Sequence, residues 1–286
     1  MILTESAFAK LNLTLDVLDR RADGYHDLRS IMQTVSVRDD ITLELDTHAP
    51  WQLECDAEGV PTDGTNLAWR AAELYLQALH KSVDGLTIRI TKRIPSEAGM
   101  AGGSTDAAAT MKGMNNLFGL GLSVPELMDL SVRIGADVPY CILGGTALAE
   151  GIGEKLTSLP AAPTCHVLIA KPDINVSTKY VYEHLDSAGI QHHPDIDGMV
   201  SAIRAGSLPG ILERLENVLE AVTIPLYPVI ADLKKRMLEL GAAGSLMSGS
   251  GPTVFGIFTD REKASDAYEQ LLSENIAKQI FLTTLP

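Results

Sequence analysis

Apolar and polar residues alternate along the first part of the chain. The odd-numbered positions from 11 to 17 are leucine or valine, while the even-numbered positions from 10 to 16 are lysine, asparagine, threonine and aspartate. A period of two predicts a β-strand over residues 7–18 with one buried face. Residues 41–45 and 86–90 alternate in the same way and predict two further strands, and the Asp-Gly pair within residues 21–26 predicts a turn.

Elsewhere apolar residues recur every three or four positions, and this spacing predicts helices. The predicted helices cover residues 66–79, 105–117, 124–134, 177–185, 195–204, 208–221, 228–240 and 261–273. Apolar runs predict strands at residues 136–145, 167–170, 246–258 (two strands around a glycine-rich turn) and 279–283. Because helices and strands are mixed and residues 160–163 have the composition of a linker, we expect two α+β domains that meet near residue 160.

The segment Ile94–Ala109 combines a proline, a run of small residues and a strong helix-forming sequence. It predicts a glycine-rich loop and then a helix that starts at Ser104 or Thr105, with capping residue types at its first positions. The unpaired N–H groups and the positive dipole end of such a helix suit a phosphate group. The loop lacks the spacing of a P-loop, since no lysine precedes Ser104. The alternative is a packing loop whose small residues let a helix and a strand approach closely.

Three other places hold polar or small residues that could carry chemistry. Lys10 and Asn12 share one face of the first predicted strand, and the alternative for them is a solvated face. Asp137 follows a predicted helix end, where the dipole disfavours a carboxylate, so a buried Asp137 would need a cation such as Lys10. The alternative is a turn in which Asp137 starts the next strand. Serines and glycines at residues 245–255 could place backbone N–H groups beside an anion, or form an ordinary hairpin turn.

Charge and cysteine usage exclude several classes of protein. Lys and Arg number 23 against 37 Asp and Glu, for a formal net charge of −14. This balance argues against nucleic acid or an anionic membrane as the main partner. Cys55, Cys141 and Cys165 lack metal-site spacing, and we expect free thiols in a reducing cytoplasm. The first residues lack signal-peptide features, and no apolar run reaches the roughly 18 residues of a membrane span.

Three segments together resemble the signatures of the GHMP kinase superfamily, which includes galacto-, homoserine, mevalonate and phosphomevalonate kinases. They are AFAKLN at residues 7–12, PSEAGMAGGST at 95–105 and MSGSGPTVF at 247–255, in the family's order. Residues 9–30 and 135–156 are similar to the members of the family whose alcohol substrate carries a cytidine diphosphate. The resemblance therefore covers nearly the whole chain.

The resemblance implies a two-domain α+β fold. Residues 1–160 would form a domain like ribosomal protein S5 domain 2, and residues 161–286 a ferredoxin-like domain. Lys10 and Asp137 match the family's catalytic pair. The residues that match its nucleotide-binding positions are Asn66, Lys92, Pro95, Ser96, Glu97, Ala98, Gly99, Met100, Ala101, Gly102, Gly103, Ser104 and Thr105. The residues that match its substrate-binding positions are Asn12, Tyr25, His26, Tyr182, Gly249 and Ser250.

Two details of these matches are open to test. Tyr25 would stack on the cytosine and His26 would hydrogen-bond it, with Tyr182, or failing that Tyr180, as the second aromatic wall. The loop departs from the family's pattern at Met100, Ala101 and Thr105. If the backbone at Ala101 needs a positive φ, its side chain costs roughly 1 kcal/mol or more.

The implied activity is the transfer of a phosphoryl group from ATP, with Mg²⁺, to a hydroxyl of a small cytidyl diphosphate alcohol. Asp137 would accept the hydroxyl proton or orient the hydroxyl, and Lys10 would keep Asp137 ionised and stabilise the transferring group. No carboxylate cluster has convincing metal spacing, so no protein ligand to Mg²⁺ is predicted. The alternatives are a kinase of the same family for another small alcohol, such as mevalonate or homoserine, and a non-catalytic nucleotide-binding relative. The oligomeric state is not visible in the sequence.

Overall fold

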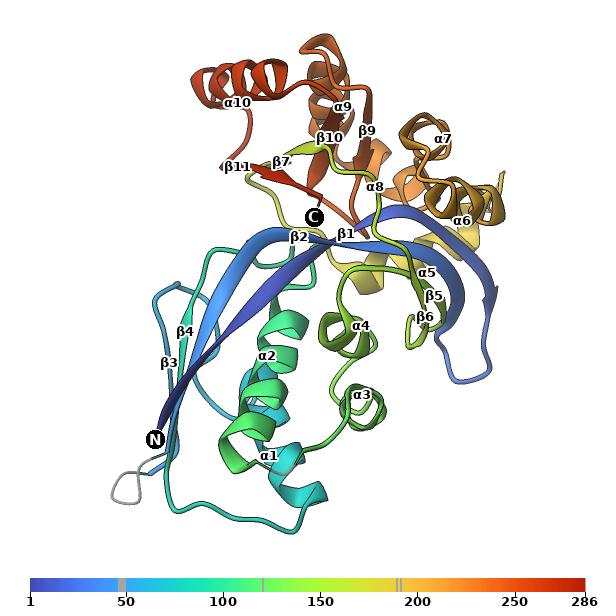
Figure 1. Ribbon diagram of the computed structural model, residues 1–286. Coiled ribbons are helices and arrows are strands. Elements are labelled where there is room, and N and C mark those ends of the chain that lie inside the picture. The colour runs from blue at the N-terminus through green and yellow to red at the C-terminus, as the bar shows by residue number, and fades with distance from the viewer. Residues whose placement is uncertain (46–49, 120, 189, 191, 286) are drawn as a thin grey trace. The chain divides into compact units, whose positions relative to one another are not determined.

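The computed structural model describes residues 1–45, 50–119, 121–188, 190 and 192–285 (Figure 1). The chain divides into two compact units, each built from several segments. Unit 1 comprises Met1–Ala9, Val37–Ser96 and Ala101–Gly144, and unit 2 comprises Lys10–Ser36, Glu97–Met100 and Gly145–Pro286. Strands β1 (Ile2–Arg20) and β2 (His26–Leu45) supply residues to both units. This division by packing is not a single cut in the sequence, and none of its boundaries falls at residue 160. The domain boundary expected near residue 160 stays a prediction.

Unit 1 packs four helices with a small sheet. The C-terminal part of β2 pairs antiparallel with β4 (Leu86–Thr91), and β3 (Gln52–Cys55) pairs parallel with β4. The helices are α1 (Leu67–Ala78), α2 (Gly102–Phe118), α3 (Val124–Ser131) and α4 (Val138–Leu143). Side chains from strands and helices share one buried core, for example Leu43, Ile88, Tyr75 and Met111. This core fixes the start of α2 beside the end of β4.

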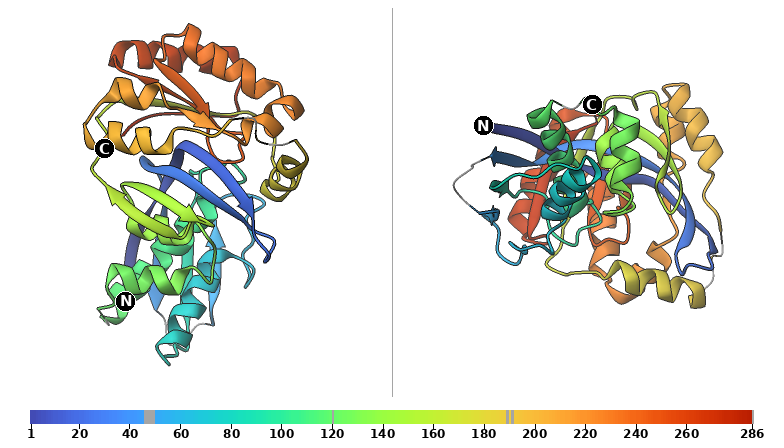
Figure 2. Two further views of the ribbon diagram at one scale, coloured as in Figure 1. Left: turned by 90° about the vertical axis from the view of Figure 1, so that its right-hand side faces the viewer. Right: turned by 90° about the horizontal axis from the view of Figure 1, so that it is seen from below.

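Unit 2 contains an antiparallel sheet in the order β11-β7-β10-β9. Its strands are β7 (His166–Lys171), β9 (Gly244–Met247), β10 (Val254–Phe258) and β11 (Gln279–Thr284). Its helices are α5 (Thr178–Ala188), α6 (Ile196–Arg204), α7 (Leu208–Leu212), α8 (Glu220–Leu226), α9 (Val229–Glu239) and α10 (Arg261–Glu274). Figure 2 shows α9 and α10, in orange and red, against this sheet, where Leu233 and Leu271 share a core with Leu168 and Phe258.

The rest of unit 2 surrounds the N-terminal strands. The hairpin of β5 (Thr146–Gly151) and β6 (Lys155–Leu159) extends the sheet from β2, with Leu28–Gln33 opposite Thr146–Gly151. The short strand β8 (Glu216–Asn217) pairs parallel with Thr14 and Leu15 of β1. These pairings hold the central part of β1 between β2 and β8, so this part of β1 is an interior strand of its sheet.

The mixed α+β architecture is confirmed, and two predicted elements are wrong. Residues 136–145 do not form a strand, because Val138–Leu143 form α4. A short apolar run does not distinguish a buried strand from a buried helix turn, and a proline in the first turn favours the helix. The helix predicted over residues 208–221 is broken into α7, β8 and α8. The strands β3, β5 and β6 were not predicted, and neither were residues 26–40 of β2.

Candidate active site

The polar face of β1 is buried in unit 2. Lys10, Asn12, Thr14 and Asp16 are each at most 5% exposed. The interpretation of this face as solvated is therefore wrong. Charged and amide groups out of contact with water need hydrogen-bonding partners, and the partners of this face identify the site.

Lys10 and Asn12 form a hydrogen-bonded pair that extends to β2. The Lys10 Nζ donates to Asn12 Oδ1 at 2.7 Å, and Asn12 Nδ2 donates to Ser30 Oγ at 2.8 Å. Ser30 Oγ in turn donates to the backbone oxygen of Thr14 at 2.6 Å. Ser30 was not predicted, since a single serine in a strand carries no motif.

Two glycine-rich segments meet this pair within unit 2. Ser248 Oγ accepts from the backbone N–H of Asn12 at 3.3 Å and donates to the backbone oxygen of Gly99 at 3.0 Å. The backbone N–H of Lys10 donates to the oxygen of Met100 at 3.3 Å. Residues from all three predicted signatures therefore lie together, although they are up to 238 positions apart between Lys10 and Ser248. Ser248 lies inside the third signature but was not singled out.

Close approach of backbones explains why two of these positions are glycine. A Cβ on Gly99, at φ +70°, would lie 2.1 Å from the backbone oxygen of Ser248. A Cβ on Gly249, at φ +57°, would lie 3.2 Å from the oxygen of Gly99. Asn217 supports the second loop, since its Nδ2 donates to the oxygens of Met247 and Gly249, each at 2.8 Å. The turn between β9 and β10 therefore also packs against the backbone of Gly99.

The start of α2 differs from the prediction. The helix begins at Gly102, earlier than Ser104 or Thr105, and its N-cap residue is Ala101 at φ +59°. The predicted side-chain capping is wrong, because no side chain makes a cap hydrogen bond at this helix start, and Thr105 Oγ1 donates to the oxygen of Gly102 at 2.8 Å. Backbone N–H groups without a side-chain cap at the start of a 17-residue helix suit a phosphate.

The packing alternative for this loop accounts for part of its composition. A Cβ on Gly102 would lie 3.2 Å from both Lys92 Nζ and Ile94 Cγ2, so this glycine allows close packing. Gly103, in contrast, is exposed. Pro95 and Ser96 belong to unit 1 with the start of α2, while the intervening residues 97–100 belong to unit 2.

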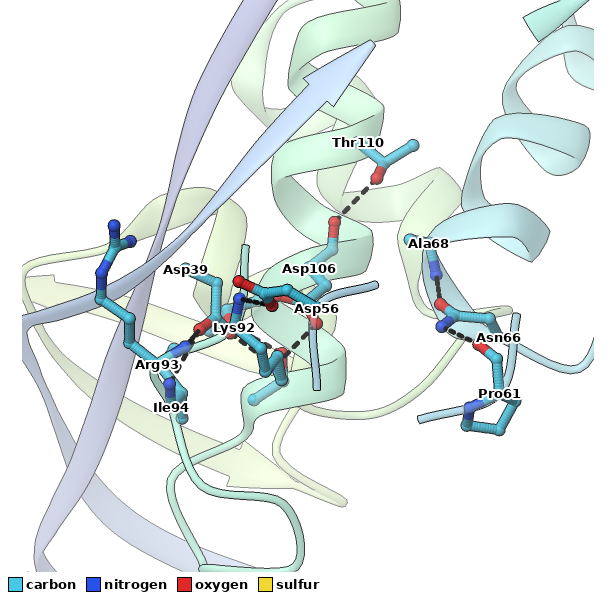
Figure 3. A network of polar contacts seen from close by, with 12 residues as sticks. Asp39, Asp56, Pro61, Asn66, Ala68, Lys92, Arg93, Ile94, Asp106 and Thr110 are labelled. Atoms are coloured by element: carbon cyan, nitrogen blue, oxygen red, sulfur yellow. Dashed lines mark hydrogen bonds and ion pairs between the residues drawn. The ribbon is translucent and has the colours of Figure 1, made fainter. Parts of the chain in front are cut away.

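Lys92 lies between two buried carboxylates at the base of this helix (Figure 3). Its Nζ donates to Asp39 Oδ2 at 2.5 Å and to Asp106 Oδ2 at 2.8 Å, and the three side chains are at most 7% exposed. Asp39 Oδ1 also accepts from the backbone N–H groups of Arg93 and Ile94, at 2.5 and 2.8 Å. Asp39 was not predicted, and Asp106 is one of the residues at the start of α2 whose type suits a helix cap.

Burial and charge act against each other in this cluster. Burial raises the pKa of Asp106 to about 7, while the ammonium group of Lys92 opposes that rise. Burial alone would lower the pKa of Lys92, but Asp106 and Asp39 outweigh it and the net shift is upward. Asp106 Oδ1 is buried without a hydrogen-bonding partner among the described residues. The raised pKa values keep Lys92 protonated and make Asp106 a weaker acid than an exposed aspartate.

Asn66 is the N-cap of α1. Its Oδ1 accepts from the N–H of Ala68 at 2.9 Å, and its Nδ2 donates to the oxygen of Pro61 at 2.7 Å (Figure 3). Asn66 and Lys92 therefore both have structural partners, and their contact with a nucleotide stays a prediction.

The predicted base-binding residues lie mainly on β2 and α5. The rings of His26 and Tyr182 have centroids 5.4 Å apart and are tilted by 35°. Tyr180 stacks on His184 at 3.7 Å, so Tyr182, and not the fallback Tyr180, packs against His26. Tyr25 follows the turn after β1 and is 59% exposed, which leaves its ring accessible.

Two residues at the start of α5 orient this helix. Ser177 Oγ accepts from the N–H of Tyr180 at 3.3 Å, as expected for a helix cap. Thr178 Oγ1 lies 2.8 Å from the hydroxyl oxygen of Ser250. The helix that carries Tyr182 is thereby linked to the second glycine-rich loop.

Asp137 is half-buried and belongs to unit 1. The expectation that it follows a helix and starts a strand is wrong, because α3 ends at Ser131 and Asp137 is the N-cap residue of α4. The dipole argument thereby changes sign, since a helix start favours a carboxylate. Its pairing with Lys10, which belongs to unit 2, stays a prediction.

The structure also bears on metals, thiols and membranes. Within the described part of the chain, no three His, Cys, Asp or Glu side chains group together in a way that could hold a metal ion. Cys55, Cys141 and Cys165 are free thiols, as expected. Among the described residues, no helix combines the length and apolar character that crossing a membrane requires.

Comparison with known proteins identifies the family. The family profile "GHMP kinases N terminal domain" matches residues 66–145, and "GHMP kinases C terminal" matches residues 199–278. A 4-diphosphocytidyl-2-C-methyl-D-erythritol kinase from Lachnospira eligens is 50% identical over 277 residues, covering 97% of this chain and 96% of the relative. The kinase of the same name from Caldicellulosiruptor saccharolyticus is 49% identical over 278 residues, covering 97% and 95%.

Solved structures agree with the sequence relatives. The crystal structure of a 4-(cytidine 5'-diphospho)-2C-methyl-D-erythritol kinase superposes with a TM-score of 0.81 at 32% identity, over 99% of this chain and 98% of that one. A homoserine kinase from Cytophaga hutchinsonii has a TM-score of 0.75 at 21% identity, over 99% and 94%, which supports the fold alone. With a fold shared along its whole length and relatives at up to 50% identity, the chain belongs to the GHMP kinase family.

Proposed function

We propose that this protein transfers the γ-phosphoryl group of ATP to the 2-hydroxyl of 4-diphosphocytidyl-2-C-methyl-D-erythritol, a step of non-mevalonate isoprenoid precursor synthesis. The observation that carries the proposal is identity of up to 50%, over nearly the whole chain, to kinases named for this substrate. The buried pair of Lys10 and Asn12 beside two glycine-rich loops supports the chemistry.

ATP binds at the loop of residues 95–105 in this proposal. The phosphates face the backbone N–H groups at the start of α2, which lack a side-chain cap. Asn66 and Lys92 lie near the nucleotide, and the Lys92 cluster with its two carboxylates holds the end of β4 against α2. Mg²⁺ enters with ATP as part of the substrate complex.

Phosphoryl transfer depends mostly on positioning and on neutralising charge. Lys10 stabilises negative charge on the transferring group, and Asp137 orients the acceptor hydroxyl or takes its proton. Asn12 contacts the substrate near that hydroxyl and holds the ammonium group of Lys10 through its amide oxygen. Asn12 also ties the strand to the glycine-rich loop through Ser248.

The cytidyl group of the substrate lies between aromatic residues in this proposal. Tyr25 stacks on the cytosine, His26 hydrogen-bonds it, and Tyr182 forms the second wall beside His26. Gly249 and Ser250 contact the remainder of the substrate from the second glycine-rich loop. The protein acts in the cytoplasm on small molecules, with no nucleic acid or membrane as a partner, and its family domains divide at residue 160.

A coupled assay of ADP release tests the proposal. Purified protein receives Mg·ATP and either 4-diphosphocytidyl-2-C-methyl-D-erythritol, mevalonate, homoserine or galactose. Turnover with the cytidyl substrate alone is the expected result. Turnover with another alcohol would replace the substrate assignment, and ATP binding without turnover on any alcohol would indicate a non-catalytic relative.

A further inference from the structure

We propose that Ser30 is a positioning residue, whose hydroxyl sets the orientation of the Asn12 amide toward Lys10. This inference rests on the proposed function, in which Lys10 and Asn12 act at the transferring phosphoryl group. Ser30 lies on β2, opposite Ala149 of β5, and it is fully buried. Its hydroxyl therefore has no contact with solvent and must find its hydrogen-bonding partners inside the protein.

The directions of the hydrogen bonds follow from the chemistry of each group. A serine hydroxyl has one proton, and Ser30 donates it to the oxygen of Thr14 at 2.6 Å, where the backbone oxygen can only accept. Toward Asn12, at 2.8 Å, Ser30 Oγ can then only accept. The NH₂ group of the Asn12 amide must therefore point to Ser30, and its oxygen must point away from Ser30.

Lys10 needs this orientation. An ammonium group has three donors and no acceptor, so the atom of Asn12 that lies 2.7 Å from Lys10 Nζ must be the amide oxygen. A flipped amide would bring two donors together at Lys10 and leave Ser30 without its donor. Ser30 and Lys10 thus select the same orientation from opposite ends of one side chain.

The other contact of Asn12 does not fix its amide. Ser248 Oγ accepts from the backbone N–H of Asn12 at 3.3 Å, which holds the strand but not the side-chain torsion. The Asn12 side chain hydrogen-bonds to Lys10 and to Ser30, and Ser30 is the neutral one of these two groups that distinguish the amide orientations. Removing its hydroxyl leaves a buried NH₂ group without an acceptor and weakens the hold on Lys10.

The chain offers a matched control in Thr14. Its hydroxyl is also buried, but it has no hydrogen-bonding partner among the described groups. Thr14→Val removes this hydroxyl at nearly constant volume and keeps the backbone oxygen that accepts from Ser30. Ser30→Thr keeps the hydroxyl of Ser30 and serves as the conservative rescue variant.

Steady-state kinetics in the coupled assay form the first part of the test, with the alcohol that the wild type phosphorylates. Ser30→Ala should lower kcat about tenfold, the rate equivalent of one ordinary hydrogen bond, with the KM for ATP unchanged. Ser30→Thr should recover most of the loss, and Thr14→Val should match the wild type. In an Asn12→Ala background, Ser30→Ala should change kcat less than twofold, because the residue through which it acts is gone.

The inference fails if Ser30→Ala keeps wild-type kcat, or if its effect persists in the Asn12→Ala background. It also fails if Thr14→Val lowers kcat as much as Ser30→Ala, because a general loss of packing would then explain both. Failure of the wild type on the cytidyl substrate, with turnover on another alcohol, would overturn only the proposed function.

A second readout needs no turnover. The side-chain NH₂ signal of Asn12 in the ¹H–¹⁵N NMR spectrum should exchange slowly with water in the wild type and in Thr14→Val. In Ser30→Ala it should shift and exchange faster, because the acceptor is removed. An Asn12 signal that is unchanged in Ser30→Ala would refute the positioning role, whichever alcohol the enzyme uses.

Discussion

Replacing Lys92 by methionine tests the buried charge cluster of unit 1. Methionine has a similar length and fills the space of the lysine stem without its charge. The change removes the ammonium donor at 2.5 Å from Asp39 and at 2.8 Å from Asp106, and all three side chains are almost completely buried. We expect a large loss of stability, because two carboxylates are left in the interior without their cation.

The structure limits the size of this loss. Removing one partner of a buried ion pair costs about 3–5 kcal/mol. Asp39 keeps two backbone N–H donors, from Arg93 and Ile94, when the ammonium group of Lys92 is removed. Asp106 has no such donors, so its pKa, already raised to about 7 by burial, rises further when Lys92 is absent. Protonation of Asp106 then replaces ionisation and keeps the loss within that range.

The loss should depend on pH, with a definite sign. In the folded variant the pKa of Asp106 lies above its wild-type value of about 7, while the unfolded chain ionises Asp106 near its ordinary pKa of 3.8, so stability falls as pH rises. The wild type follows the same slope only up to the pKa of about 7. One retained proton changes stability by about 1.4 kcal/mol per pH unit. Between pH 6 and pH 8 the gap between the two proteins should therefore widen, because the variant keeps its proton to a higher pH than the wild type does.

Urea unfolding at pH 6 and pH 8, followed by circular dichroism, measures both effects. Arg93→Gln is the matched control, since it breaks the neighbouring but exposed ion pair between Arg93 and Asp40. That pair should be worth less than about 1 kcal/mol at either pH. A loss for Lys92→Met no larger than the control, or a loss that shrinks from pH 6 to pH 8, would refute the reasoning.

Three further predictions concern the catalytic pair, the base-binding residues and the glycine-rich loop. Asp137→Asn should lower kcat by about 10²-fold or more in the coupled assay, and near-normal turnover would remove Asp137 from the mechanism. Tyr25→Ala should raise the KM for the cytidyl substrate and leave the KM for ATP unchanged, whereas Tyr180→Ala should change neither; equal effects on both substrates would contradict the stacking role. Ala101→Gly should raise the free energy of unfolding by about 0.5–1 kcal/mol, because Ala101 has a φ of +59°. The same change at Ala231, inside α9, should lower it by about 1 kcal/mol, and urea unfolding of both variants would expose any reversal of this order.

Periodicity located most of the long elements, although it predicted only residues 41–45 of β2 (His26–Leu45). Alternation found the strand at residues 7–18, and apolar spacing found α1 to within a residue at each end. Both signals average over many positions, so they tolerate single exceptions. They failed on α4, where six residues of apolar sequence carry no period that separates a helix from a strand. They also failed on β8, which exists only because Glu216 and Asn217 pair with β1 across the fold.

The site was predictable where a motif marks it and unpredictable where tertiary partners define it. The three signatures led to Lys10, Asn12 and Gly99, which the structure brings together through Ser248. Asp39 gave no signal, because its importance depends on Lys92, which is 53 positions away in the sequence. The polar face of β1 was ambiguous for the same reason, since the sequence does not show that Ser30 and the loop at Ser248 contact it.

The negative net charge of the chain bears on how the proposed ATP site at the start of α2 attracts phosphate groups. A protein with a formal net charge of −14 repels polyanions at long range, so attraction for ATP must act locally. Lys92 lies near this helix start but is matched by two carboxylates, so the cluster supplies no net positive charge even when Asp106 is protonated. In the proposed function, backbone N–H groups at this helix start supply part of that attraction, because they are fixed in direction and need no counter-charge. A side-chain cap from Ser104 or Thr105 would occupy those N–H groups. Instead α2 starts after Ala101, which has a left-handed conformation, and the helix start has no side-chain cap.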